Sequence, residues 1–200
     1  ECAWMDHEEL MEFEEDMIIY IIQHVIKTCK SELDYLGRDV SELKKIKKPF
    51  LRLPYDEALK ILGKKKGYDL TDKDERELLE KVDKGPIHLT QFPRDMKAFY
   101  MKVDPKDTKK VKASDLLMPG MGEIIGGSER ISDPKELEQS LKIFKLKKED
   151  YAWYMDLRKY GTVPHSGFGL GIERMVVWLA GIDHIMDAIA FPRTMDRVYP

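Results

Sequence analysis

A glycine-rich segment near the C-terminus, Gly167-Phe168-Gly169-Leu170-Gly171-Ile172-Glu173-Arg174, has residue types suited to holding a nucleotide. Alternate glycines remove side chains from one face of a strand, so a flat group can lie against the backbone. Arg174 then falls in the first turn of the following helix, where its guanidinium can meet phosphate oxygens. The alternative is a strand packed closely under a helix, with Arg174 in a surface ion pair, and the glycines alone slightly favour it. A dinucleotide fingerprint fits less well, because no glycine follows Gly171 three residues later.

The segment Gly122–Arg130 is a second candidate, since it combines a carboxylate, glycines and an arginine. Alternation along an extended strand places Glu123 and Ile125 on one face until the two glycines that follow interrupt the pleat. A carboxylate in such a strand suits Mg²⁺, which takes oxygen ligands and keeps waters and substrate phosphates in its shell.

Asp115 lies on the preceding predicted strand and becomes a second ligand if the two strands form a hairpin through Pro119-Gly120. Arg130 could bind a carboxyl or amide oxygen of a ligand. Edge-strand ion pairs, Glu123 with Arg130 or Glu129 with a neighbouring lysine, explain the same residues equally well.

The histidines add little to these candidates. His24 and His88 fall in apolar segments and are better explained by packing, and only His165 precedes the glycine run closely. The chain has no Ser-His-Asp set, no Cys-His pair and no histidines at metal-ligand spacing, so nucleophilic catalysis and zinc hydrolysis have no support. Any chemistry must therefore come from positioning and electrostatics around phosphate and a divalent ion.

The elements that must hold these residues are predicted as helices followed by a sheet. A capping box at Asp6-His7-Glu8-Glu9 opens a long amphipathic helix, and Asp133-Pro134 is an N-cap followed by a proline at the first helical position. The patterns predict helices over about 6–30, 55–62, from 71, from 134 and over 151–160, and strands over 87–91, 99–103, 116–118 and 122–131. The sum is an α+β fold, in which helices flank a mostly antiparallel sheet.

Composition and charge describe one folded domain. The chain has 200 residues, 42% hydrophobic and 36% charged, which excludes disordered and fibrous classes, and no stretch approaches the ~20 apolar residues of a membrane span. Two cysteines, Cys2 and Cys29, favour a reducing, cytoplasmic compartment. A net charge of −3 argues against a surface that is basic throughout. Residues 27–66 carry 12 Lys or Arg against 6 Asp or Glu, which indicates either solvated helix faces or a local basic face.

Taken together, these motifs resemble class II aminoacyl-tRNA synthetases, and within them the asparaginyl group of archaeal and eukaryotic type. Gly167–Arg174 is similar to motif 3 of that class. Aspartyl enzymes typically have Ser-Gly-Ala-Gln-Arg where this chain has Gly126–Arg130. The further marks are Pro93, Lys97–Met101, Gly122–Ser128 with Arg130, Asp156–Gly161 and Pro164–Gly169. The resemblance covers essentially the whole chain and implies a class II catalytic domain.

On the ATP side, the resemblance assigns Arg174 to the γ-phosphate and Gly171, Ile172 and Glu173 to the wall beside the adenine. Asp115 and Glu123 would hold Mg²⁺ on the phosphates. Arg174 and Glu123 would therefore be the catalytic residues, with ATP and Mg²⁺ as cofactors.

On the amino-acid side, Gly126 and Arg130 would bind the substrate side chain. The implied activity is formation of asparaginyl-adenylate from asparagine and ATP, followed by transfer to tRNA(Asn) by a homodimer. An aspartyl-tRNA synthetase is the nearest alternative, and an asparagine synthetase of the same ancestry is a more distant one.

The family's motifs 1 and 2 correspond to positions upstream of Glu1. We therefore expect residues 1–200 to form a single domain, the C-terminal part of a class II catalytic domain, and to be inactive in isolation. A non-catalytic binding module derived from a synthetase is the alternative from another class. Residues 30–85 are expected to be a helical, Lys-rich insertion, and residues 86–200 to carry the sheet and motif 3.

Overall fold

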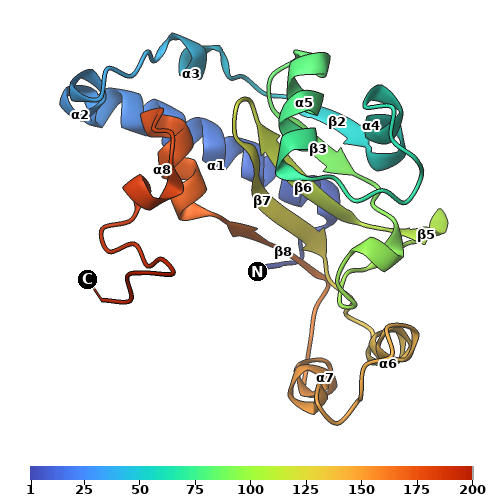
Figure 1. The fold of residues 1–200 in the computed structure, drawn as a ribbon. Coiled ribbons are helices and arrows are strands. Elements are labelled where there is room, and N and C mark those ends of the chain that lie inside the picture. The colour runs from blue at the N-terminus through green and yellow to red at the C-terminus, as the bar shows by residue number, and fades with distance from the viewer. Residues whose placement is uncertain (200) are drawn as a thin grey trace.

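The computed structural model describes residues 1–199 and contains a six-stranded mixed sheet in the order β1-β8-β7-β6-β3-β2 (Figure 1). Only β2 and β3 are parallel, and every other neighbouring pair is antiparallel. A separate two-stranded ribbon joins β4 to β5. The strands are β1 (Cys2–Ala3), β2 (Leu51–Pro54), β3 (Ile87–Thr90), β4 (Val103–Asp104), β5 (Asp107–Val111), β6 (Ala113–Met118), β7 (Gly122–Glu129) and β8 (His165–Leu170).

Helices cover both faces of this sheet, which confirms the α+β prediction. They are α1 (His7–Thr28), α2 (Lys30–Tyr35), α3 (Ser41–Lys45), α4 (Tyr55–Ile61), α5 (Asp72–Val82), α6 (Pro134–Ile143), α7 (Ala152–Lys159) and α8 (Ile172–Ala180), with 3₁₀ turns at Arg94–Met96 and Ile185–Ala188. The expected caps form. Asp6 and Glu9 bond each other's backbone N–H at the start of α1, and Asp133 accepts from Glu136 before the proline that opens α6.

Two hydrophobic cores lie on opposite sides of the sheet, because side chains alternate along β6. Leu117 packs with α4 and α5, whose buried residues include Leu59 and Leu78. Leu116 packs with α1, α3 and α8, whose buried residues include Ile18 and Trp178. The edge strand β2 and helices α4 and α5 thus belong to the same sheet and core as residues 86–200.

The strand predicted over 99–103 is wrong. Met101 makes only an isolated bridge to Arg130, and the strand in this region is the two-residue β4. Phe99 and Tyr100 have the aromatic character of strand residues, but their rings pack against Tyr154 of α7, with centroids 5.8 and 6.1 Å away. Tertiary packing of these rings overrides the local strand preference.

Candidate active site

Three neighbouring strands bring the predicted site residues onto one face of the sheet. Asp115 of β6 lies opposite Gly126 of β7, which lies opposite Gly169 of β8. Nothing stands within 4 Å of the position that a Cβ on Gly169 would occupy. The predicted hairpin between β6 and β7 is confirmed, and the glycines leave backbone exposed on the face that Asp115 shares.

The prediction that Glu123 and Ile125 share a face is wrong, because β7 contains a bulge. Leu116 pairs with Ile125 but Leu117 pairs with Glu123, so Ile124 is an extra residue in β7. Ile124 and Ile125 are both buried in the core under α1 and α8. The bulge turns Glu123 onto the face of Asp115.

The carboxylates of Asp115 and Glu123 meet above Gly126. Oδ1 of Asp115 and Oε1 of Glu123 lie 3.5 and 2.9 Å from the point where a Cβ on Gly126 would stand. Burial raises the pKa of both groups, and the neighbouring Asp115 charge raises the pKa of Glu123 further. Two close carboxylates whose charged forms are disfavoured by burial form a donor set suited to a divalent cation.

Lys97 and Glu75 complete this cluster, and neither was assigned a role from the sequence. Lys97 Nζ lies 2.5 Å from Asp115 Oδ2, and 3.8 Å from the centroid of the Phe92 ring. Glu75 Oε2 accepts the backbone N–H of Glu123 at 2.9 Å. These four residues, together with Asp69, line one small cavity of about 150 Å³. Lys97 stood in the segment that carried the family resemblance, whereas Glu75 had no sequence signal beyond its place in a helix rich in charge.

Arg174 lies beside Glu123, so the structure brings together the two segments Gly122–Arg130 and Gly167–Arg174 that the sequence singled out. Gly171 donates its N–H to the carbonyl of Ile124 at 2.9 Å, which attaches the start of α8 to β7. Arg174 Nη1 donates to the carbonyl of Glu123 at 2.7 Å, and Nη2 lies 3.3 Å from Asp72 Oδ1. The ion pair that we considered as the alternative therefore exists, but it stands next to the carboxylate cluster. Ile172 and Glu173, the predicted adenine wall, are exposed.

Arg130 lies at the other end of β7 and has a different partner from the one considered. Its Nη2 lies 2.9 Å from Glu1 Oε1, its Nη1 contacts the hydroxyl of Ser128, and its guanidinium is 5.2 Å from the Tyr100 ring. The Glu1 carboxylate covers Gly167 so closely that no Cβ would fit there. Burial disfavours the charged form of Glu1, but the hydrogen bond and charge of Arg130 outweigh it and lower the pKa.

The other alternative pairing is also present. The Glu129 carboxylate lies 2.8 Å from the ammonium groups of both Lys102 and Lys112, so it forms an ion-pair cluster at the end of β7. His88 is fully buried and stacked on Phe50, as a packing residue. His165 begins β8, and its ring Nδ1 lies 2.8 Å from the carbonyl oxygen of Val163.

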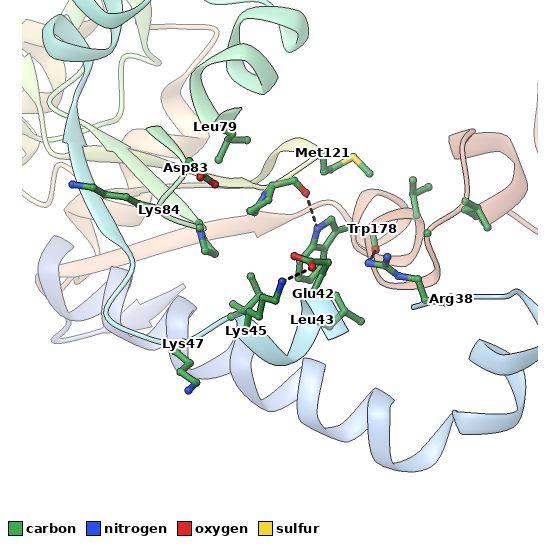
Figure 2. A pocket seen from close by; sticks show the side chains of 18 residues that line it. Arg38, Glu42, Leu43, Lys45, Lys47, Leu79, Asp83, Lys84, Met121 and Trp178 are labelled. Carbon is green, nitrogen blue, oxygen red and sulfur yellow. Dashed lines mark hydrogen bonds and ion pairs between the residues drawn. The ribbon is translucent and has the colours of Figure 1, made fainter. Parts of the chain in front are cut away.

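A larger cavity of about 680 Å³ lies away from these residues, between α3, the end of α5 and α8 (Figure 2). Arg38 donates to the carbonyls of Trp178 and Leu179 at 3.1 and 3.0 Å, and Trp178 Nε1 donates to Pro119 at 3.0 Å (Figure 2). These bonds satisfy carbonyls at the end of α8 and the hairpin turn. None of the predicted site residues lines this cavity.

No helix within residues 1–199 is long and apolar enough to cross a membrane. Within the same residues, no group of three or more His, Cys, Asp or Glu side chains is arranged to hold a metal ion. Asp115 and Glu123 are two carboxylates, the number with which Mg²⁺ is commonly held when substrate phosphates supply further ligands.

The mixed sheet carries a face of glycine backbone, with Glu123 and Arg174 at one end of that face and Arg130 at the other. This arrangement is that of a class II synthetase. The family model for class II tRNA synthetases (D, K and N) matches residues 1–195, and the chain belongs to this family. Among curated relatives, the asparagine–tRNA ligase of Desulforamulus reducens is 45% identical over 206 residues, and that of Pyrococcus abyssi is 46% identical. Both matches take in the whole of this chain but only 48% and 47% of the relative, so the chain spans about half the length of these curated relatives.

Solved structures agree with the sequence relatives. The asparaginyl-tRNA synthetase of Pyrococcus horikoshii complexed with asparaginyl-adenylate superposes with a TM-score of 0.92 at 45% identity, over 99% of this chain and 47% of that chain. An aspartyl-tRNA synthetase of Entamoeba histolytica gives a TM-score of 0.84 at 27% identity, over 100% of this chain and 43% of that chain. The resemblance to the asparaginyl group is therefore confirmed.

Proposed function

We propose that this chain provides the adenylate-forming face of an asparagine–tRNA ligase, which activates asparagine with ATP and charges tRNA(Asn). The observation that carries the proposal is the arrangement along β7. The Glu123 carboxylate lies beside Gly126, and the Arg130 guanidinium contacts the hydroxyl of Ser128. Two residues of extended strand, about 7 Å, separate these points. Phosphate-binding and amino-acid-binding groups thus converge on one bare stretch of backbone.

The pair of Glu1 and Arg130 favours asparagine over aspartate. A side-chain amide offers a carbonyl oxygen that accepts from a guanidinium and an NH₂ that donates to a carboxylate. Arg130 and Glu1 supply these two complements side by side, 2.9 Å apart. The lowered pKa keeps Glu1 ionised at neutral pH. The carboxylate of aspartate would instead face the Glu1 charge, which penalises it.

The reaction requires no nucleophile from the protein. The α-carboxylate of asparagine attacks the α-phosphorus of ATP, a P–O bond forms, and the bond to pyrophosphate breaks with its electron pair. Arg174 would hold the outer phosphate, and Asp115 and Glu123 would hold Mg²⁺, which when bound neutralises the growing charge on pyrophosphate. Lys97 keeps the buried Asp115 carboxylate compensated. Gly171, Ile172 and Glu173 would flank the adenine, and Gly126 leaves room for the reacting groups.

The remaining partners belong to the same proposal. The terminal adenosine of tRNA(Asn) would take the asparaginyl group from the adenylate, and the whole protein would act as a homodimer, as the resemblance implies. We place it in the cytoplasm, which both cysteines support because they are free thiols in the structure.

ATP–pyrophosphate exchange by the protein as its gene encodes it tests the proposal. We expect exchange driven by asparagine and Mg²⁺, with little driven by aspartate. Exchange driven by aspartate instead would replace the proposal with an aspartyl-tRNA synthetase. Exchange with neither amino acid would contradict it in favour of a non-catalytic binding module.

A further inference from the structure

The first two turns of α5 contact the phosphate side of the site, although they lie far along the chain from the glycine-rich strand. Asp72 contacts Arg174, and Arg76 Nε donates to the carbonyl of Met121 at 3.3 Å. Between them, Glu75 accepts the N–H of Glu123. This part of α5 therefore contacts the side chain of Arg174 and the backbone of Glu123, the two residues that the proposed function places at ATP and Mg²⁺.

Glu75 is built into the fold at this point. The residue is only 9% exposed, although it carries a carboxylate. The position of a Cβ on Gly122 would lie 2.8 Å from Glu75 Oε2, and Gly122 has a φ of +90°, which glycine adopts without strain. Glycine before Glu123 is thus what allows the Glu75 carboxylate to approach the bulged strand.

Both backbone polar groups of Glu123 are held by side chains from other elements. Glu75 of α5 accepts its N–H, and Arg174 of α8 donates to its carbonyl. A bulge weakens the regular ladder at this position, so these two contacts replace strand pairing as the restraint on the residue. The carboxylate of Glu123 remains free to face Asp115 and a ligand.

We propose that Glu75 is a positioning residue, which fixes the backbone of Glu123 so that its carboxylate and the Arg174 guanidinium stand ready for Mg²⁺ and ATP. The proposal rests on the proposed function, since it concerns the same site. Glu75 acts through its hydrogen bond to the backbone rather than as a third ligand. Its oxygen acts on Glu123, and its negative charge is not needed for that role.

Two substitutions separate these possibilities in the full protein. Glu75→Ala removes the acceptor, whereas Glu75→Gln keeps an acceptor oxygen and removes the charge. We expect Glu75→Ala to raise the KM for ATP and the Mg²⁺ concentration for half-maximal exchange by about 10- to 100-fold, the range seen for outer partners of metal ligands. The KM for asparagine should stay unchanged. Glu75→Gln should restore wild-type values, and Glu80→Ala, on the exposed side of the same helix, is the matched control.

A binding measurement makes the test independent of turnover. Mn²⁺ bound in the presence of a non-hydrolysable ATP analogue, followed by electron paramagnetic resonance, should weaken in Glu75→Ala and not in Glu75→Gln. Gly122→Ala, which crowds the same oxygen, should weaken it as Glu75→Ala does and serves if Glu75→Ala fails to fold. Unaltered Mn²⁺ binding in both Glu75→Ala and Gly122→Ala would overturn the proposal. A Gln variant as weak as the Ala variant would overturn it too, in favour of a charge effect.

The two proposals fail in different ways. If the wild-type protein shows no exchange, the proposed function fails, but Mn²⁺ and nucleotide binding still report on Glu75. If exchange is normal and Glu75→Ala raises the KM for asparagine as much as that for ATP, the positioning role fails and the proposed function stands.

Discussion

Glu14 and His88 form a buried pair between α1 and the sheet, and this pair should make stability fall as the pH rises. Both side chains are fully buried, and within residues 1–199 none of their four polar atoms has a hydrogen-bond partner. Glu14 Oε2 lies 3.7 Å from His88 Nδ1. Burial raises the pKa of Glu14 to about 8 and lowers the pKa of His88 to about 3. The folded pair therefore holds one proton at neutral pH, whichever residue carries it.

The magnitude follows from counting protons. The ordinary pKa values are 4.5 for the carboxyl and 6.5 for the imidazole, so the unfolded pair holds about half a proton at pH 6.5 and almost none at pH 8. The folded pair keeps its proton until about pH 8. Because the folded state binds more protons in this window, the free energy of unfolding falls by about 0.9 kcal/mol per pH unit, or about 1.3 kcal/mol between pH 6.5 and 8. Glu75, whose pKa burial raises to about 7, adds a loss of the same sign at the lower end.

Glu14→Gln removes the carboxyl proton and preserves the side-chain size. Denaturant unfolding of the 200-residue chain at several pH values from 6.5 to 8 should show the variant gaining about 1.6 kcal/mol relative to wild type across the window, because it loses the Glu14 contribution alone. Glu12→Gln, on the exposed side of α1, should run parallel to wild type. A wild-type curve that is flat over this window, or a Glu14→Gln curve parallel to it, would refute the reasoning.

Three further substitutions test the site and the core. Arg174→Ala should lower kcat/KM for asparagine-dependent exchange about 100-fold, because it removes a charge that faces the phosphates, while the KM for asparagine stays unchanged. A KM for asparagine that rises as much as kcat/KM falls would contradict this role. Gly126→Ala places a methyl group 2.9 Å from Glu123 Oε1 and should weaken Mg²⁺ activation about tenfold, and unchanged Mg²⁺ dependence would count against the shared site. Leu78→Ala, at a fully buried position, should cost about 2–5 kcal/mol in denaturant unfolding, against about 0.5 kcal/mol or less for the exposed Leu36→Ala.

Elements with strong local signals were predicted well. The long first helix, the proline-started helix at Asp133 and the hairpin through Pro119-Gly120 depend on caps and turns within a few residues of each other. The strand predicted over 99–103 failed because its aromatic residues pack against a helix some fifty positions later in the chain. Nothing within that segment distinguishes the two environments.

The sequence by itself was enough to identify the family, and it singled out the glycine-rich strand that leads into Arg174 and the carboxylates Asp115 and Glu123 as candidates for a site. Motifs of this kind are contiguous, so residue type and spacing carry the information. Only the tertiary structure decided which face of β7 carries Glu123, because a bulge is set by the register of two strands and not by either one.

The partners of the site residues were likewise decided by the fold. Glu75 binds the backbone of Glu123, Lys97 pairs with Asp115, and Glu1 pairs with Arg130 across 129 positions of the chain. Charged residues are common on any soluble surface, and a sequence does not show which of them are brought together. Burial against a specific opposite charge or backbone group is what turns these few into parts of a site.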